Sequence, residues 1–139
     1  MTVGAVEGRT WLEILSPVEC RTLLRAATVG RVAFVVGDHP EVMPVNYAMD
    51  GNAVVFRTDP GTKLTAALSQ AAIAFQVDDI DADRDVGWSV LVVGPADRVT
   101  APDEVARLAQ LDLRPWVRGD KAHWVRMDTT TISGRRIVR

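Results

Sequence analysis

Hydrophobic and polar positions along this chain of 139 residues fall into short runs with the two-residue period, or the β-branched content, of strands. Residues 31–36 lie between two glycines and are apolar at nearly every position, which indicates a strand buried on both faces. The Asp-Gly-Asn sequence at 50–52 is a strong hairpin signal, and we expect Gly94 and Pro95 to bend the longest run. The predicted strands cover residues 31–36, 41–49, 53–58, 72–77, 87–99, 123–127 and 131–138.

Three further segments have the spacing or the end signals of helices. The sequence SPVE at 16–19 has the form of a capping box, with Ser16 as the N-cap and Glu19 reaching back to it. Apolar residues then recur at helical spacing as far as Gly30, where the helix should end. Residues 62–70 and 102–111 are the other two predicted helices.

Six or so strands joined by hairpin turns, with few helices, predict a mainly β fold: a small six-stranded antiparallel barrel with helices at its edges. The length fits a single domain spanning residues 1–139, in which residues 1–14 form a flexible N-terminal arm. Several strands are apolar on both faces, so one face needs cover from a helix or from a second subunit. We therefore expect a homodimer.

Composition narrows the possible partners and the compartment. The formal net charge is −2 and the isoelectric point is near 5.6, which does not favour binding to nucleic acid or to an anionic membrane. The single cysteine, Cys20, excludes an internal disulfide framework and fits a reducing compartment. The sequence starts without the pattern of a signal peptide, and its apolar runs are too short to span a bilayer. We expect a cytoplasmic protein.

Candidate binding chemistry gathers in the stretch FRTDPGTKL, residues 56–64, where a predicted strand gives way to a predicted helix. Two cations and two hydroxyl groups lie at the end of the strand and around the turn after it, which contains a glycine. They could cradle a phosphate with the unpaired N–H groups of the new helix, or they could simply form a solvated turn. The spacing does not match a Walker A loop. The residues concerned are Arg57, Thr58, Gly61, Thr62 and Lys63.

Other motifs give weaker signals. The acidic run DDIDADRD at 78–85 lacks the glycine and the final glutamate of a calcium-binding loop, so we interpret it as a solvated loop. The spacing of His39, His123 and Cys20 does not suit zinc, and we predict no metal site. The sequence contains no G-x-S-x-G elbow and no evident acid–base pair. No catalytic residue is assigned.

Five fragments, in this order, resemble the flavin-binding split β-barrel family typified by pyridoxamine 5′-phosphate oxidase, and specifically its small actinobacterial-type members. The fragments are LSPVECRTLLRAATVGRVAF (15–34), PVNYAMDGNAVVFRTDPGTKL (44–64), AFQVDDID (74–81), GWSVLVVG (87–94) and SGRRI (133–137). The resemblance covers roughly residues 15–137. It implies a six-stranded split barrel that forms a homodimer, with two FMN sites at the subunit interface.

The resemblance also implies roles for individual residues. The strand along the flavin ring would contain Met43, Pro44, Val45, Asn46 and Tyr47, and the stretch at 57–63 would hold the FMN phosphate. Trp88 and Ser89 would approach the flavin from the partner subunit, although Trp88 taken alone is more typical of core or interface packing. Trp124 and Arg135 are looser matches to positions that line the site. The chain lacks the longer N-terminal arm and the full arginine and histidine set that grip pyridoxal phosphate in the larger oxidases.

Three functions are consistent with the sequence. The first is an FMN-dependent oxidoreductase acting on a small molecule, because the cofactor can supply redox chemistry without a protein nucleophile. The second keeps the fold and replaces FMN by a deazaflavin coenzyme. The third is a non-catalytic flavin carrier or sensor.

Overall fold

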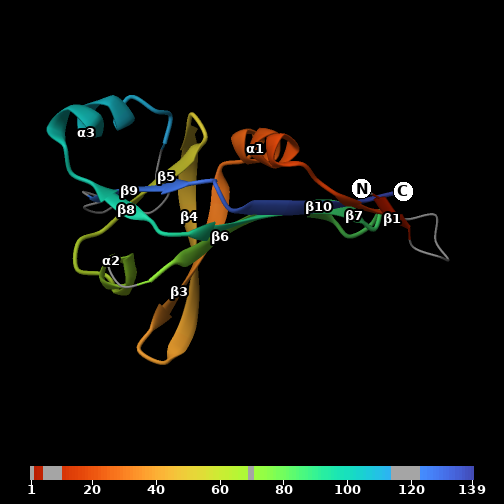
Figure 1. Cartoon of the computed structure of the whole chain (residues 1–139), viewed down its shortest axis with the longest axis horizontal. Coiled ribbons are helices and arrows are strands. Elements are labelled where there is room, and N and C mark those ends of the chain that lie inside the picture. The colour runs from red at the N-terminus through yellow and green to blue at the C-terminus, as the bar shows by residue number, and fades with distance from the viewer. Residues whose placement is uncertain (1, 5–10, 69–70, 114–122) are drawn as a thin grey trace.

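The computed structural model describes residues 2–4, 11–68, 71–113 and 123–139 (Figure 1). Within these residues there are ten strands and three helices. The strands are β1 (Thr2–Gly4), β2 (Trp11–Ile14), β3 (Val29–Val36), β4 (His39–Asp50), β5 (Ala53–Thr58), β6 (Ile73–Asp81), β7 (Val86–Gly94), β8 (Asp97–Val99), β9 (His123–Asp128) and β10 (Ile132–Val138). The helices are α1 (Pro17–Ala26), α2 (Lys63–Leu68) and α3 (Pro102–Leu108).

The strands form one antiparallel sheet in the order β1-β2-β10-β7-β6-β3-β4-β5-β9-β8, which curls into a half-barrel (Figure 1). The prediction of a mainly β, antiparallel barrel with few helices is confirmed. The described residues contain ten strands rather than six. The expected strand at 87–99 divides into β7 and β8 at Gly94, and the N-terminal segment adds β1 and β2.

Helix α1 begins as its capping box predicts. The Ser16 hydroxyl accepts a hydrogen bond from the Glu19 amide at 3.2 Å, and the Glu19 carboxylate accepts one from the Ser16 amide at 3.0 Å. The helix ends at Ala26, earlier than expected, because β3 already begins at Val29. It lies over one face of the sheet and buries Leu24 there (Figure 1).

The main core fills the inner side of the curled sheet beneath α1. Tyr47 and Phe75 meet there edge to face, with ring centroids 4.9 Å apart. Gly30 has no side chain because a Cβ at this position would lie 2.4 Å from the Phe75 ring. A second, smaller cluster of Val55, Leu108 and Trp124 lies between the β5–β9 pair and α3.

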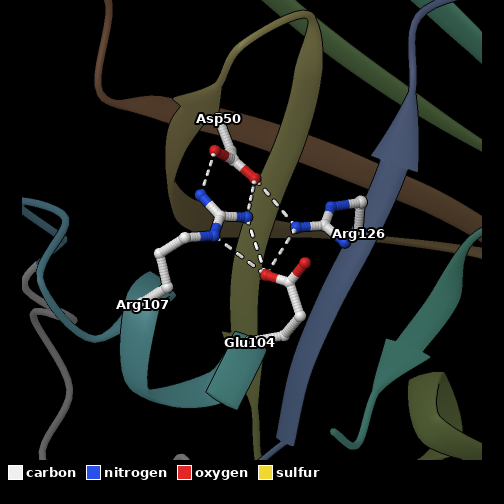
Figure 2. A network of polar contacts seen from close by, with 4 residues as sticks. All are labelled: Asp50, Glu104, Arg107 and Arg126. Carbon is white, nitrogen blue, oxygen red and sulfur yellow. Dashed lines mark hydrogen bonds and ion pairs between the residues drawn. The ribbon is translucent and has the colours of Figure 1, made fainter.

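Four charged residues fasten α3 beside the β4–β5 hairpin (Figure 2). Both guanidinium Nη atoms of Arg107 donate to the two carboxylate oxygens of Asp50, each at 2.8 Å. Arg126, on β9, donates to Asp50 Oδ2 at 2.8 Å, and Glu104 accepts from Arg107 Nε at 2.9 Å. We call these four residues the hairpin clamp.

The opposite face of the central strands is uncovered in the single chain. Strand registers place alternate side chains of β2, β3, β4, β6, β7 and β10 on this face, including several exposed apolar groups. We call it the open face, defined by Ile14, Val35, Val42, Ile80, Leu91, Val93 and Ile137. The expected homodimer stays a prediction.

Two sequence predictions need correction. Residues 1–14 were expected to form a flexible arm, but their described parts form β1 and β2, and β2 pairs with β10 because Trp11 and Leu12 oppose Val138 and Ile137. The acidic segment 78–85 was expected to be a loop. Its first half completes β6, which pairs with β7 up to Asp81 and Val86, so only the tip of this hairpin is a turn. Acidic side chains are compatible with this strand because they reach solvent at its outer end.

Candidate functional site

Arg57 is held in place by an indole ring. It lies opposite Trp124 in the β5–β9 pair, and its guanidinium carbon is 5.1 Å from the centroid of the Trp124 ring. Trp124 is itself buried, so the ring provides a fixed surface for the cation. Strand alternation directs Arg57 away from the main core, which receives its neighbour Phe56. Trp124, the looser match in sequence, thus supports a predicted site residue.

Thr58, at the end of β5, and the threonines that come after it form a chain of hydroxyl groups. The Thr58 and Thr62 hydroxyls are 3.4 Å apart, and Thr62 Oγ1 lies 2.9 Å from Thr65 Oγ1. The Thr62 hydroxyl also accepts a hydrogen bond from the Thr65 amide at 3.1 Å, so it caps α2. Gly61 makes the turn with φ +74°, a left-handed conformation that favours glycine.

Helix α2 differs from the prediction in a way that matters for the site. It spans six residues, Lys63–Leu68, instead of the expected nine from residue 62 to residue 70, of which 69–70 lie outside the described residues. Its aligned peptide dipoles are therefore few, and the Thr62 hydroxyl satisfies the amide of Thr65. Attraction of an anion here depends mainly on side-chain cations rather than on the helix terminus.

Lys63 reaches back to β4. Its Nζ lies 3.3 Å from Glu41 Oε2, and the same oxygen lies 3.4 Å from His39 Nε2. The Lys63 side chain is 66% exposed, so it can move to another anion without breaking a packed core. Glu41 was not among the site residues predicted from the sequence. The available signal was that His39, Glu41 and Met43 alternate on one face of a strand.

The segment Met43–Tyr47 lies in β4 and presents alternating faces. Tyr47 is buried, and its hydroxyl donates to the Leu24 carbonyl at 2.6 Å. Burial raises the pKa of Tyr47, so this phenol stays neutral. Val45 packs on the same core, whereas Pro44 and Asn46 alternate onto the face that carries Arg57. A ligand along this segment could therefore contact its backbone and the side chains of Pro44 and Asn46 on the second face.

Trp88 and Ser89 lie far along the sheet from Arg57. In the order of strands, β6, β3 and β4 separate β7 from β5. Ser89 faces the open face, where it pairs with Arg135, whereas Trp88 points to the opposite face and packs at the margin of the core. A cavity of about 530 Å³ is found at this end of the sheet. It is lined by Trp11, Leu12, Ile80, Gly87, Trp88, Ser89, Arg135 and Ile137.

The described residues offer little other reactive chemistry. They contain no group of three or more His, Cys, Asp or Glu side chains that could hold a metal ion. Burial raises the pKa of the Cys20 thiol, which disfavours a reactive thiolate. Among the described helices, none is both long enough and apolar enough to cross a bilayer.

The arrangement therefore consists of two separate parts. A guanidinium fork, an ammonium group and threonine hydroxyls near the start of α2 suit the oxygens of a phosphate. A largely apolar cavity with Ser89 and Arg135 lies at the other end of the sheet. Such groups can bind and orient a ligand.

Comparison with known proteins gives consistent matches along most of the chain. The family profile described as pyridoxamine 5′-phosphate oxidase matches residues 16–136. An uncharacterised protein of Mycobacterium tuberculosis is 35% identical over 125 residues, which cover 86% of this chain and 82% of that protein.

Two solved structures are similar to this chain in both sequence and fold. The FAD binding protein from Mycobacterium smegmatis is 36% identical with a TM-score of 0.76, and the match covers 88% of this chain and 96% of that chain. A protein from Corynebacterium glutamicum, described as a candidate pyridoxamine 5′-phosphate oxidase, is 31% identical with a TM-score of 0.77. That match covers 90% of this chain and 92% of that chain.

Proposed function

This chain belongs to the pyridoxamine 5′-phosphate oxidase family and has its split-barrel fold, and on that premise we propose that it binds a flavin nucleotide and uses it for redox chemistry on a small molecule. The observation that carries the proposal is the position of Arg57. Its guanidinium is held by the Trp124 ring, one residue before Thr58, whose hydroxyl begins the threonine chain that leads to Lys63, and there it could meet a phosphate.

Each of the cations and hydroxyl groups of this stretch has a proposed role in binding the phosphate. Arg57 supplies a planar fork for two phosphate oxygens, and Lys63 supplies a mobile point charge. Thr58, Gly61 and Thr62 shape the turn between them. The β4 backbone from Met43 to Tyr47 would lie along the flavin ring, with Pro44 and Asn46 on the ligand side.

FMN is the flavin that we propose, and two other ligands compete with it. The similar protein from M. smegmatis is described as FAD binding, and at 36% identity it makes FAD the principal competitor. A deazaflavin coenzyme also carries phosphate, so Arg57 and Lys63 could serve all three ligands.

A second copy of the chain would complete the site. The cavity beside Ser89 and Arg135 is separated from Arg57 by three strands of the same sheet, so one chain cannot bring both parts to one ligand. The open face between them carries apolar side chains beside the polar group of Arg31, Gln76 and Asp78, and burial of its apolar part against an identical face would favour a dimer. We propose a homodimer in which Trp88 and Ser89 contribute to the partner's flavin site.

Redox chemistry would come from the flavin, while the protein binds and orients it and keeps water away. The apolar cavity at β7 and β10 offers space for a small organic substrate beside Ser89. A cytoplasmic location is part of the proposal, because a chain with the single cysteine Cys20 has no internal disulfide that would require an oxidising compartment.

The first experiment identifies the ligand. The absorbance spectrum of the purified full-length protein should show an oxidised flavin, and mass spectrometry after denaturation should identify it as FMN. Release of FAD would correct the choice of flavin. A colourless protein that binds neither FMN nor FAD when they are added would overturn the proposed function. Oxidation of a nicotinamide cofactor in the presence of an acceptor separates an enzyme from a carrier.

The second experiment tests the phosphate site. The double variant Arg57→Ala/Lys63→Ala should lose flavin and keep its fold, since exposed cations contribute little to stability. Asp38→Ala is a control because it removes a charged side chain from the neighbouring β3–β4 hairpin and keeps Arg57, Lys63 and Glu41. Stoichiometric flavin in the double variant would refute the assignment of Arg57 and Lys63.

The third experiment tests assembly. Light scattering should give the mass of a dimer for the wild-type chain. Leu91→Asp places a charge at the centre of the open face and should yield monomers with weakened flavin binding. Full flavin affinity in a monomer would contradict a site shared between subunits.

A further inference from the structure

The strongest unassigned feature is the carboxylate that faces the proposed phosphate ligand Lys63. Glu41 lies near the start of β4, where its cross-strand neighbour on β3 is the buried Phe34. Its Oε2 is shielded from solvent and lies 3.3 Å from Lys63 Nζ and 3.4 Å from His39 Nε2. Within the described part of the chain, this oxygen accepts no aligned hydrogen bond. The contacts are therefore electrostatic and loosely directed.

A negative charge at this position is unexpected in a site for an anion. A phosphate that approaches Lys63 must take it from Glu41, and it must also approach the Glu41 carboxylate itself. Both effects oppose binding of an anion, and they do so at short range, where screening by salt is incomplete. Nothing in the packing of the described residues requires an acidic side chain here, because the inner neighbour Phe34 is apolar.

We propose that Glu41 is an internal counter-anion that holds Lys63 when no ligand is bound and yields it to the phosphate of the ligand. This inference rests on the proposed function, because it assigns Lys63 to the cofactor phosphate. Glu41 thereby lowers the affinity for phosphate-bearing ligands and leaves the affinity for the ring unchanged. It is a positioning residue for Lys63 rather than a ligand.

His39 makes the exchange easier. Glu41 Oε2 lies almost equally far from His39 and from Lys63, so a protonated His39 would stay beside the carboxylate after the lysine moves. His39 also lies 3.6 Å from Asp38 Oδ1, so the tip of this hairpin contains two carboxylates and one imidazole. Replacement of His39 by Gln should therefore make Glu41 retain Lys63 more strongly and weaken binding of phosphate-bearing ligands slightly.

The test compares FMN with riboflavin, which has the same ring and no phosphate. Full-length protein stripped of flavin is titrated with each ligand, and flavin fluorescence is recorded. Glu41→Gln keeps the shape of the side chain and should bind FMN about threefold to tenfold more tightly than wild type, which is the range expected for one partly exposed charge contact and its repulsion. Riboflavin affinity should stay the same in both proteins.

Two further variants separate a local effect from a general change in charge. Asp38→Asn removes the same charge from the same hairpin but leaves Lys63 with its partner, so FMN affinity should change less than twofold, roughly. In a Lys63→Ala background, Glu41→Gln should lose most of its effect, because the two residues act through one contact. Equal FMN affinity in wild type and Glu41→Gln would overturn the proposal, as would an equal gain for riboflavin or a full gain without Lys63.

A readout without flavin keeps this inference distinct from the proposed function. Lys63 of the ligand-free protein is modified with an amine-reactive reagent and followed by mass spectrometry. Lys63 should react severalfold faster in Glu41→Gln than in wild type or Asp38→Asn, because its ammonium group has lost its carboxylate. Equal rates would refute the pairing even if flavin binds. If neither FMN nor FAD binds, the proposed function fails, and the rates alone decide whether Glu41 holds Lys63.

Discussion

Strand β4 carries a charged cluster at each of its ends, and the two clusters are built differently. At the C-terminal end, Asp50 lies in the hairpin clamp, where three aligned hydrogen bonds of 2.8 Å bind it to Arg107 and Arg126. At the N-terminal end, Glu41 contacts Lys63 and His39 at 3.3 and 3.4 Å, and its buried oxygen accepts no aligned hydrogen bond from the described residues.

The difference in geometry indicates a difference in role. A carboxylate gripped by two guanidinium groups in fixed directions holds elements together, and here it joins α3 and β9 to the β4–β5 hairpin (Figure 2). A loose ion pair to an exposed lysine can be exchanged at little cost. The first cluster should therefore control stability, and the second should control ligand affinity. The predictions below test this separation, beginning with the largest expected effect.

Asp50→Asn should give the largest loss of stability. Two arginines then face each other across a neutral amide in a partly buried site, and we expect a loss of about 1 to 2 kcal/mol in the free energy of unfolding. Urea denaturation measures this change. Flavin affinity of the folded protein should be unaltered. An unfolding free energy equal to that of wild type would show that the clamp has no structural role.

The pH dependence of stability should follow Asp50. Hydrogen bonds from Arg107, and then from Arg126, lower the pKa of Asp50 to about 2 from the ordinary value of 3.8. Because the folded-state pKa is lowered, this stabilisation is present above about pH 4 and is lost as the pH falls towards 2. The gap between wild type and Asp50→Asn should therefore be constant near neutral pH and should shrink between pH 4 and pH 2. A gap that is independent of pH would contradict this assignment.

Tyr47→Phe distinguishes a core residue from a ligand contact within the predicted flavin strand. Removal of the hydroxyl leaves the Leu24 carbonyl without its 2.6 Å donor, and we expect a loss of about 1 kcal/mol in stability. Flavin affinity should stay the same, because the phenol lies in the core. A fall in flavin affinity with unchanged stability would instead place the Tyr47 side chain in the ligand site.

Glu41→Gln should have the smallest effect on stability, within about 0.5 kcal/mol. The same variant should bind FMN more tightly than wild type, so FMN affinity changes while the free energy of unfolding hardly does. A loss of stability as large as that of Asp50→Asn would mean that both ends of β4 are structural. The comparison between the two clusters would then fail.

Local signals predicted the elements that depend on local chemistry. The capping box at Ser16 and Glu19 placed the start of α1, and the Asp-Gly-Asn turn placed the β4–β5 hairpin. The predicted strand at 53–58 coincides with β5, because its bounds are set by that turn and by the residues before Pro60. The sequence predictions failed for segments whose structure depends on the strand that they pair with. The acidic half of β6 is a strand because β7 offers a complete ladder to it.

The candidate site also contains residues that a local sequence pattern predicted and residues that only the fold brings together. The residues Arg57, Thr58, Thr62 and Lys63 could be selected from one stretch of sequence because their side-chain chemistry suits phosphate. Trp124 lies 67 positions after Arg57 in the numbering, and Glu41 lies before a turn and a strand, so no local pattern connects either of them with the site. Their roles become visible only where β9 and β4 bring them next to Arg57 and Lys63.

The sequence alone determined that this protein is a mainly β domain with a phosphate-suited turn, because strand period, helix caps and turn residues act over a few neighbouring positions. The tertiary structure decided which cation is fixed and which can move. Arg57 rests on a buried indole, whereas Lys63 is exposed and shared with a carboxylate. That distinction depends on distances between side chains from separate strands, and chain folding sets those distances.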